Sequence, residues 1–168
     1  MRLIFAALPL CLLTSACASG ASSREEVSSP AAVVAQLYHD YAWEVVLDDA
    51  RAWATLTDEP RDVLMQYFDD RLVDLLEEDQ RCRERTKQIC TLDGSPIWYS
   101  NDPEATRLTV AGGADSTEIA VSFTRSQPPS EGAIISLTYR MARTPRGWRV
   151  HDVRFPGGRS LVELLSAP

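Results

Sequence analysis

The side chains in this sequence best suited to proton transfer near neutral pH are its two histidines, His39 and His151. His151 is followed directly by Asp152, and an imidazole beside a carboxylate can serve general acid–base catalysis. Neighbouring residues of a strand point to opposite faces, so this pair can meet only at a β-bulge. We therefore interpret His151 and Asp152 as a kink that bends a strand, with Asp152 paired to a nearby arginine. His39 is interpreted as structural, and we predict no catalytic residue.

Other chemistry-bearing patterns have simpler explanations. Carboxylates are paired at Asp48-Asp49, Asp69-Asp70 and Glu77-Glu78. A glycosidase needs two carboxylates at a set distance across a cleft, whereas neighbours on a helix are explained by caps and solvated faces. The sequence contains no nucleophile elbow, phosphate-binding loop, zinc-protease motif or dinucleotide fingerprint. We expect no cofactor and no metal site.

The four cysteines have separate predicted fates. Cys11 lies in the apolar N-terminal run and is lost with it, and Cys17 is a lipidation candidate. Cys82 and Cys90 remain, and in an oxidising compartment two nearby cysteines usually pair. Their spacing is not Cys-x-x-Cys and no histidine is near in sequence, which disfavours a metal site. A disulfide is predicted, and in the loop-entropy model it contributes about 2.5 kcal/mol.

The N-terminus has the pattern of an export signal. Met1-Arg2 precedes an apolar run from Leu3 to Leu13, too short to span a bilayer in the mature protein. Thr14-Ser15-Ala16-Cys17 resembles a bacterial lipobox, although Thr14 stands where leucine is usual. The alternative is cleavage by an ordinary signal peptidase at Ala16-Cys17-Ala18. We favour a lipoprotein signal over residues 1–16 and a flexible tether over residues 17–29.

The resemblance to bacterial lipoproteins implies a multiply acylated Cys17. Several acyl chains anchor a protein to a membrane far more firmly than one chain does. Ala18 stands where an inner-membrane retention signal would have aspartate, so we expect a periplasmic protein on the outer membrane. The alternative cleavage near Ala18 would leave a soluble periplasmic protein.

Charge is unevenly distributed along the chain. The net charge is −7, which disfavours a nucleic-acid partner. Residues 1–100 carry a net charge of −8 and residues 101–168 a net charge of +1. The acidic first half indicates solvated helix faces or, as a sharper hypothesis, a docking surface for a cationic partner.

Helix signals fill the first half of the chain. Ser29-Pro30 is an N-cap followed by a proline and predicts a helix over residues 30–47. The segment from Thr57 to Pro60 is the start signal of a second helix. Asp69-Asp70 caps a third helix with an apolar stripe of Leu72, Val73, Leu75 and Leu76.

Period-two patterns fill the second half. Alternation over residues 106–110, 119–123, 135–141 and 148–155, with short turns between, predicts an antiparallel meander of about four strands. Trp148 and Val150 are assigned to one face of the last strand, and Val153 and Phe155 to the other. Ser160 caps a short last helix. Helices followed by a meander predict one α+β domain over residues 30–168, with the N-terminal helices in the concavity of a curved sheet.

A family resemblance rests on the order of four segments: Tyr38-His39-Asp40-Tyr41, Phe68-Asp69-Asp70-Arg71-Leu72, the Gly147–Val153 strand and the Ser160–Leu165 helix. Together they resemble a family of exported bacterial proteins of unknown function with the nuclear-transport-factor-2-like, or cystatin-like, fold. The resemblance covers about residues 30–165. It implies a cone of curved sheet and helices whose open end can hold a small ligand or a partner's loop. That fold hosts enzymes, transport modules and inhibitors, so it leaves function open.

We accordingly predict a non-enzymatic lipoprotein that binds a protein or small ligand. One version is an immunity or inhibitor protein against a secreted toxin that acts in the envelope. The candidate binding residues are Tyr41, Trp98, Tyr99 and His151. Two alternatives stay open, a structural envelope lipoprotein and an isomerase or dehydratase with an acid–base residue inside the cone. The enzyme requires a deep pocket with a buried titratable group.

Overall fold

The computed structural model describes residues 29–46, 55–101, 104–126, 128 and 130–167. The predicted signal peptide, the lipidation site Cys17, most of the tether, and Asp48-Asp49 lie outside these residues. The helical elements before the sheet are α1 (Pro30–Asp40), η1 (Ala42–Val45), η3 (Leu56–Asp58), α2 (Arg61–Leu64) and α3 (Asp70–Thr86). In the described part of the chain, no helix is both long and apolar enough to cross a membrane.

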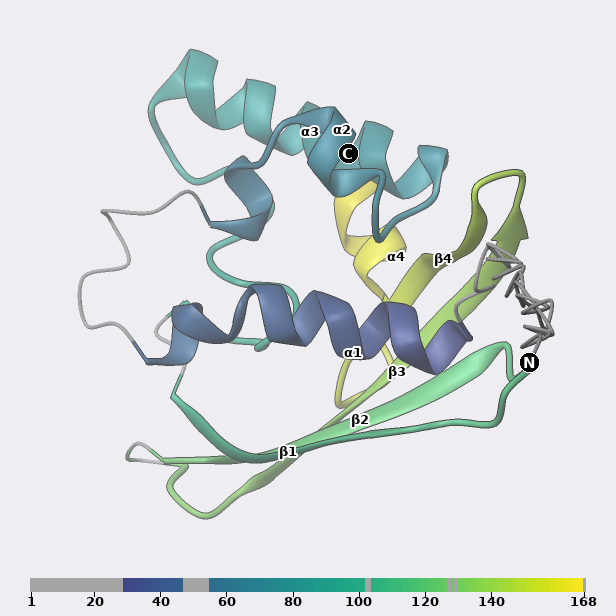
Figure 1. The fold of residues 1–168 in the computed structure, drawn as a ribbon. Helices are drawn as coiled ribbons and strands as arrows, with labels where there is room; N and C mark the ends of the chain where they lie inside the picture. Colours follow the sequence, from purple (N-terminus) through teal and green to yellow (C-terminus); the bar gives the residue numbers. More distant parts are fainter. Residues whose placement is uncertain (1–28, 47–54, 102–103, 127, 129, 168) are drawn as a thin grey trace, which may run out of the picture.

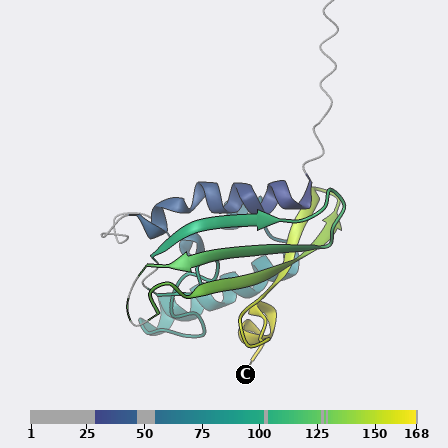
Figure 2. The ribbon, with the colours of Figure 1, turned by 90° about the horizontal axis from the view of Figure 1, so that it is seen from below.

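Four strands form one antiparallel meander in the order β1-β2-β3-β4, as the alternation predicts. They are β1 (Ala105–Ala111), β2 (Glu118–Arg125), β3 (Ile134–Thr144) and β4 (Gly147–Arg154), followed by the short helix α4 (Leu161–Leu165). Figure 1 shows α1 lying across the concave face of the curved sheet, with α2 and α3 beyond it and α4 between α3 and β4. Seen from below, after a turn of 90°, the strands lie in front of α1 and α3 (Figure 2). The predicted α+β architecture is confirmed.

Local capping fixes the helix starts. Ser29 Oγ accepts the Ala32 N–H at 3.2 Å, and Asp69 accepts the Leu72 N–H at 3.0 Å. Ser160 and Glu163 form a capping box at α4. The first helix is shorter than predicted, because Tyr41 leaves the α region (φ −112°, ψ 18°) and the chain continues as the tighter η1 turn. That change of direction carries the Glu44 carboxylate into the interior.

The predicted bulge in the last strand is confirmed. The register between β3 and β4 shifts between the pairs Arg140–Asp152 and Met141–Val150, which leaves His151 as the extra residue. Val150 and Val153 lie opposite Met141 and Tyr139, two residues apart on β3, so both valines face the same core. The assignment of the strand's two ends to different faces is therefore wrong. The extra residue reverses the alternation beyond it.

A short parallel bridge covers the outer edge of β4 at this bulge. The Val150 N–H donates to the Tyr67 carbonyl at 2.8 Å, and its carbonyl accepts the Asp69 N–H at 3.0 Å. Unpaired strand edges invite association with other strands, and this contact closes β4 at its centre. It also sets the start of α3 directly beside His151.

Candidate functional site

The imidazole of His151 contacts the carboxylate of Asp69 and not that of its sequence neighbour Asp152. Its Nδ1 lies 2.6 Å from Asp69 Oδ2, and the His151 side chain is 36% exposed against 13% for Asp69. The other oxygen of Asp69 caps α3. The pair joins β4 to α3 across the bulge. Among the described residues, the contacts of the pair include no nucleophile and no second acid–base group, so the arrangement acts as a structural link between two elements.

Asp152 turns away from His151 and is buried. Its Oδ1 accepts the Val153 N–H at 2.9 Å and the Val162 N–H at 3.1 Å, which fastens the first turn of α4 to β4. No ion pair to an arginine is among its contacts in the described residues, so the predicted arginine partner is replaced by two backbone donors. A buried carboxylate that is held by backbone N–H groups has a structural role, and here it positions α4 against β4.

Tyr41 and Trp98 belong to the core. Their side chains are 4% and 3% exposed, so neither offers a ring face to a ligand. Trp98 packs edge-on against Tyr38 and Phe123, with ring centroids 4.9 and 5.4 Å away, and Tyr41 packs edge-on against Tyr67. Burial raises the pKa of the Tyr41 phenol, as do nearby carboxylates. Aromatic side chains buried on a sheet's concave face are the ordinary consequence of covering it with a helix.

Side chains fill the concavity of the sheet. The Tyr139 hydroxyl donates to the Tyr38 hydroxyl at 2.9 Å, which donates to the Ile97 carbonyl at 2.6 Å. Burial raises the pKa of both phenols well above their ordinary values, so they stay neutral. Tyr38 and Tyr139 are almost fully buried, together with Phe123 and Leu137. These buried side chains occupy the concavity around Tyr38 and Tyr139.

Glu44 is a buried carboxylate whose charge acts on Tyr38 and Tyr139. It accepts the Leu56 N–H at 3.0 Å and the Ser95 hydroxyl at 2.6 Å. Burial raises the pKa of Glu44 above its ordinary value, although the hydrogen bonds from Leu56 and Ser95 oppose the shift. Glu44 thus links η1 to η3 and to the loop that follows α3.

Glu44→Gln is expected to leave the protein at least as stable as wild type at pH 7 and to remove part of its pH dependence. The folded state holds a proton on Glu44 between the ordinary pKa and the raised one. The contribution of this group to stability is therefore complete below the ordinary pKa and is lost as pH rises through the raised pKa. Glutamine still accepts from Leu56 and can donate to Ser95 without burying a charge.

Urea unfolding from about pH 4 to about pH 8 measures this effect. Glu44→Ala is the matched control, because it leaves two donors without an acceptor and should cost about 1–3 kcal/mol. An unfolding free energy of Glu44→Gln that follows the wild-type pH profile would contradict the assignment.

The loop over residues 91–101 is held by side chains from four other elements. Asp79 on α3 accepts the Thr91 and Leu92 N–H groups at 2.7 and 3.3 Å. Glu44 binds Ser95, Tyr38 binds the Ile97 carbonyl, and Arg125 donates to the Tyr99 carbonyl at 2.6 Å. These anchors hold the loop in place without a continuous strand ladder.

The loop closes on itself at a glycine that no other residue can replace. Ser95 and Ser100 exchange backbone hydrogen bonds of 2.8 and 3.4 Å. Gly94 has φ +141°, and a Cβ there would lie 2.4 Å from the Asn101 Cα. Both the backbone conformation and the close approach require glycine.

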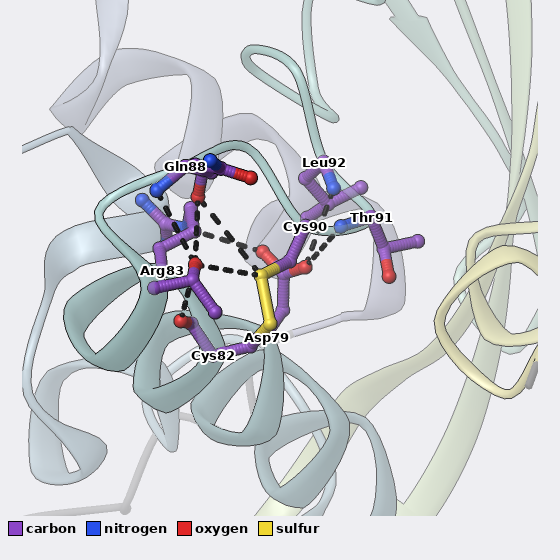
Figure 3. Close-up of a disulfide and its surroundings, with 8 residues drawn as sticks. Asp79, Cys82, Arg83, Gln88, Cys90, Thr91 and Leu92 are labelled. Carbon is purple, nitrogen blue, oxygen red and sulfur yellow. Dashed lines mark hydrogen bonds and ion pairs between the residues drawn. A yellow bond between two sulfur atoms is a disulfide. The ribbon is translucent and has the colours of Figure 1, made fainter.

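The predicted disulfide joins the end of α3 to the start of this loop (Figure 3). Cys82 and Cys90 are bonded, with Cα atoms 6.2 Å apart. Figure 3 shows Asp79, one turn earlier on α3, reaching the same loop at Thr91 and Leu92. Arg83 bonds the other Asp79 oxygen at 3.2 Å. A covalent bond and a buried carboxylate therefore fix the first residues of the loop together.

A groove of about 370 Å³ opens between this loop and the C-terminal segment. Loop residues 91–95 and 99–101 form one wall, and Phe155, Arg159 and Leu164 form the other. Gly157 has a positive φ of 87°, in the turn that brings Arg159 back toward Phe155 through a backbone hydrogen bond of 2.9 Å. We call this feature the α4 groove. Its volume lies at the lower end of the range found for small-molecule sites.

Tyr99 is the predicted binding residue that lines the α4 groove. Its ring is stacked on Phe155, with centroids 5.0 Å apart and planes inclined by 22°. The side chain is 38% exposed, while Phe155 beneath it is buried. Tyr99 has φ +51°, a backbone conformation that costs a non-glycine residue about 1–3 kcal/mol and concentrates at functional sites. The ring is thus held in a fixed position at the surface.

The structure separates the four predicted binding residues. Tyr99 lies in the α4 groove, Tyr41 and Trp98 are in the core, and His151 pins α3. Two groove-forming residues escaped sequence reasoning, Asp79 and Arg159. A signal for Asp79 was present, since it follows Leu72 and Leu76 at helical spacing and so falls on the buried stripe. Arg159 follows two glycines and had no distinguishing pattern.

The acidic helix surface is largely paired within the chain. Arg61 binds Asp74 and Glu77 at 2.7 Å each, Arg81 binds Glu78, and Arg83 binds Asp58 and Asp79. Three arginines face five carboxylates in these ion pairs, so the positive charges offset only part of the negative charge of this surface. Among the described residues no group of three or more His, Cys, Asp or Glu side chains is placed to hold a metal ion.

Comparisons with known proteins add little to this geometry. No protein-family model matches the sequence, and no curated protein matches it. The chain is similar to a solved structure, the phospholipid-binding protein from Ralstonia solanacearum in complex with a phospholipid. The two share 16% identity, with a TM-score of 0.45, over 82% of this chain and 83% of the other. A similarity of this size supports no conclusion about ligand or activity, and membership of the exported family stays a prediction.

Proposed function

We propose that this chain is a non-enzymatic envelope lipoprotein that binds a ligand in the α4 groove. The observation that carries the proposal is the fixed Tyr99–Phe155 pair on the wall of an open groove. Four side chains from distant elements hold the loop that carries Tyr99. A preformed site loses little conformational entropy on binding, which favours affinity.

The anchor and the groove belong to one proposal. Acylation of Cys17 would fix the protein to the outer membrane, with the tether over residues 17–29 placing the domain in the periplasm. The immunity or inhibitor version would require a cationic toxin surface that is complementary to the acidic helix surface described above. The ion pairs on α3 offset part of the acidic charge that a cationic partner would use, whereas the α4 groove offers a small ligand a preformed site, so the small-ligand version is preferred.

Purification of the full chain from its native host, followed by native mass spectrometry, tests the proposal. Wild type should be recovered from membranes with a bound molecule, and Cys17→Ser should move to the soluble fraction with the ligand still bound. Asn101→Trp places a large ring at the mouth of the groove and should lose the ligand. Glu118→Gln, at the far end of β2, is the matched control. Recovery of wild type without any bound molecule would contradict ligand binding.

A further inference from the structure

The polar groups of the α4 groove are mixed in kind and balanced in charge. Asp93 supplies an anionic acceptor, Arg159 a cationic donor, and Asn101 both a donor and an acceptor. Thr91 adds a hydroxyl at the same wall. The two formal charges cancel, so the groove selects neither a simple anion nor a simple cation. Ligands with many alternating donors and acceptors match this lining best.

The apolar part of the groove lining is dominated by the aromatic ring of Tyr99. Tyr99 rests on the buried Phe155, and Leu92 and Leu164 border the same hollow. In the concavity of the sheet, by contrast, Tyr38 and Tyr139 are almost fully buried. The groove therefore suits a flat ligand face more than a long flexible chain.

Several backbone groups at this wall are already paired within the chain, which disfavours a peptide strand as the ligand. Peptides that add to a protein edge depend on free N–H and C=O groups. Ser95 and Ser100 already pair their backbone groups with each other, and the Tyr99 carbonyl accepts from Arg125. The Thr91 and Leu92 N–H groups are bound by Asp79. We therefore look to the side chains of this wall for recognition of the ligand.

We infer that the ligand of the α4 groove is a carbohydrate, one sugar ring of which packs its C–H face on Tyr99. The face of an aromatic ring is electronegative and attracts polarised C–H groups. The hydroxyls around the sugar ring then meet Asp93, Asn101 and Arg159, which offer acceptors and donors on both sides. The open groove admits part of a longer glycan. This inference rests on the binding function proposed above.

Isothermal titration calorimetry on the full chain, with its anchor, tests this inference. The probes are tetrasaccharides of N-acetylglucosamine and of glucose, with tetra-alanine and a short-chain phospholipid as comparison ligands. A tetrasaccharide should bind wild type and Glu118→Gln alike, and Tyr99→Phe, which keeps the ring face, should bind it more tightly than Tyr99→Ala. Tyr99→Ala should weaken binding about tenfold, since the ring face is lost. Thermal unfolding of each variant checks that the fold is retained.

The outcomes distinguish the two proposals. The carbohydrate inference falls, and the binding function stands, if no saccharide binds but the peptide or the phospholipid does. That binding would have to be lost in the Asn101→Trp variant. If saccharides bind but Tyr99→Ala leaves the affinity unchanged, the inference also falls, because the sugar lies elsewhere. If no probe binds and nothing co-purifies with the native protein, both proposals fail.

Discussion

Asp79→Ala is expected to lower the free energy of unfolding by about 3 kcal/mol. The Asp79 side chain is 2% exposed and accepts three donors: the Thr91 and Leu92 N–H groups and the Arg83 guanidinium. Removal of the carboxylate leaves these donors in a partly buried site without their acceptor. Because Thr91 and Leu92 form the first part of the groove wall, ligand binding should weaken in the same variant. Urea unfolding measures the loss of stability.

Two variants separate the roles of Asp79. Asp79→Asn keeps an oxygen for the backbone donors but loses the charge that faces Arg83, so it should fall between wild type and Asp79→Ala. Glu78→Ala is the surface control. Its pair with Arg81 is exposed on both sides, and its loss should cost under about 0.5 kcal/mol. An Asp79→Ala protein as stable as Glu78→Ala would show that the carboxylate does not hold the loop.

Replacement of Cys82 and Cys90 together by serine is expected to cost about 2.5 kcal/mol. The bond closes a loop with a sequence separation of 8, and its removal enlarges the conformational freedom of the unfolded chain. Replacement of both cysteines avoids a free thiol. The measurement is urea unfolding of the double variant beside wild type before and after reduction, and reduced wild type should match the double variant.

The disulfide and Asp79 hold the same segment, so their effects should not add. Groups that share one structural partner commonly couple by about 0.5–3 kcal/mol. A triple variant with both cysteines and Asp79 replaced should therefore lose less stability than the separate losses combined. Strict additivity would indicate that the two contacts act independently on the loop. If the mass of the alkylated protein is the same with and without prior reduction, both thiols were already free and the bond does not form in the protein.

Local sequence patterns were sufficient to predict the main helices and the strands of this fold. Ser29, Asp69 and Ser160 each start a helix through contacts within three residues, so the neighbouring sequence alone carries the signal. Period-two alternation predicted the strands, and short turns between them left a meander as the simplest order. The Cys82–Cys90 bond followed from proximity in sequence.

The groove could be predicted only in part. Tyr99 and Trp98 were both predicted to be binding residues, but Trp98 is buried in the core. A loop lacks the fixed periodicity of a strand or helix, so the sequence does not say which of two neighbouring rings is buried. The partners of Tyr99 are Phe155, from the chain after β4, and Arg125, from the end of β2.

By itself, the sequence determined which segments are helices and strands, where they start, and which cysteines are left to pair. The tertiary structure alone decided that His151 meets Asp69 instead of Asp152, at a separation of 82 residues, and that a loop and α4 enclose a groove. The physical reason is the range of each interaction. Capping and alternation act between residues a few positions apart, whereas a bulge reverses side-chain direction and a parallel bridge brings distant segments together only once the sheet has formed.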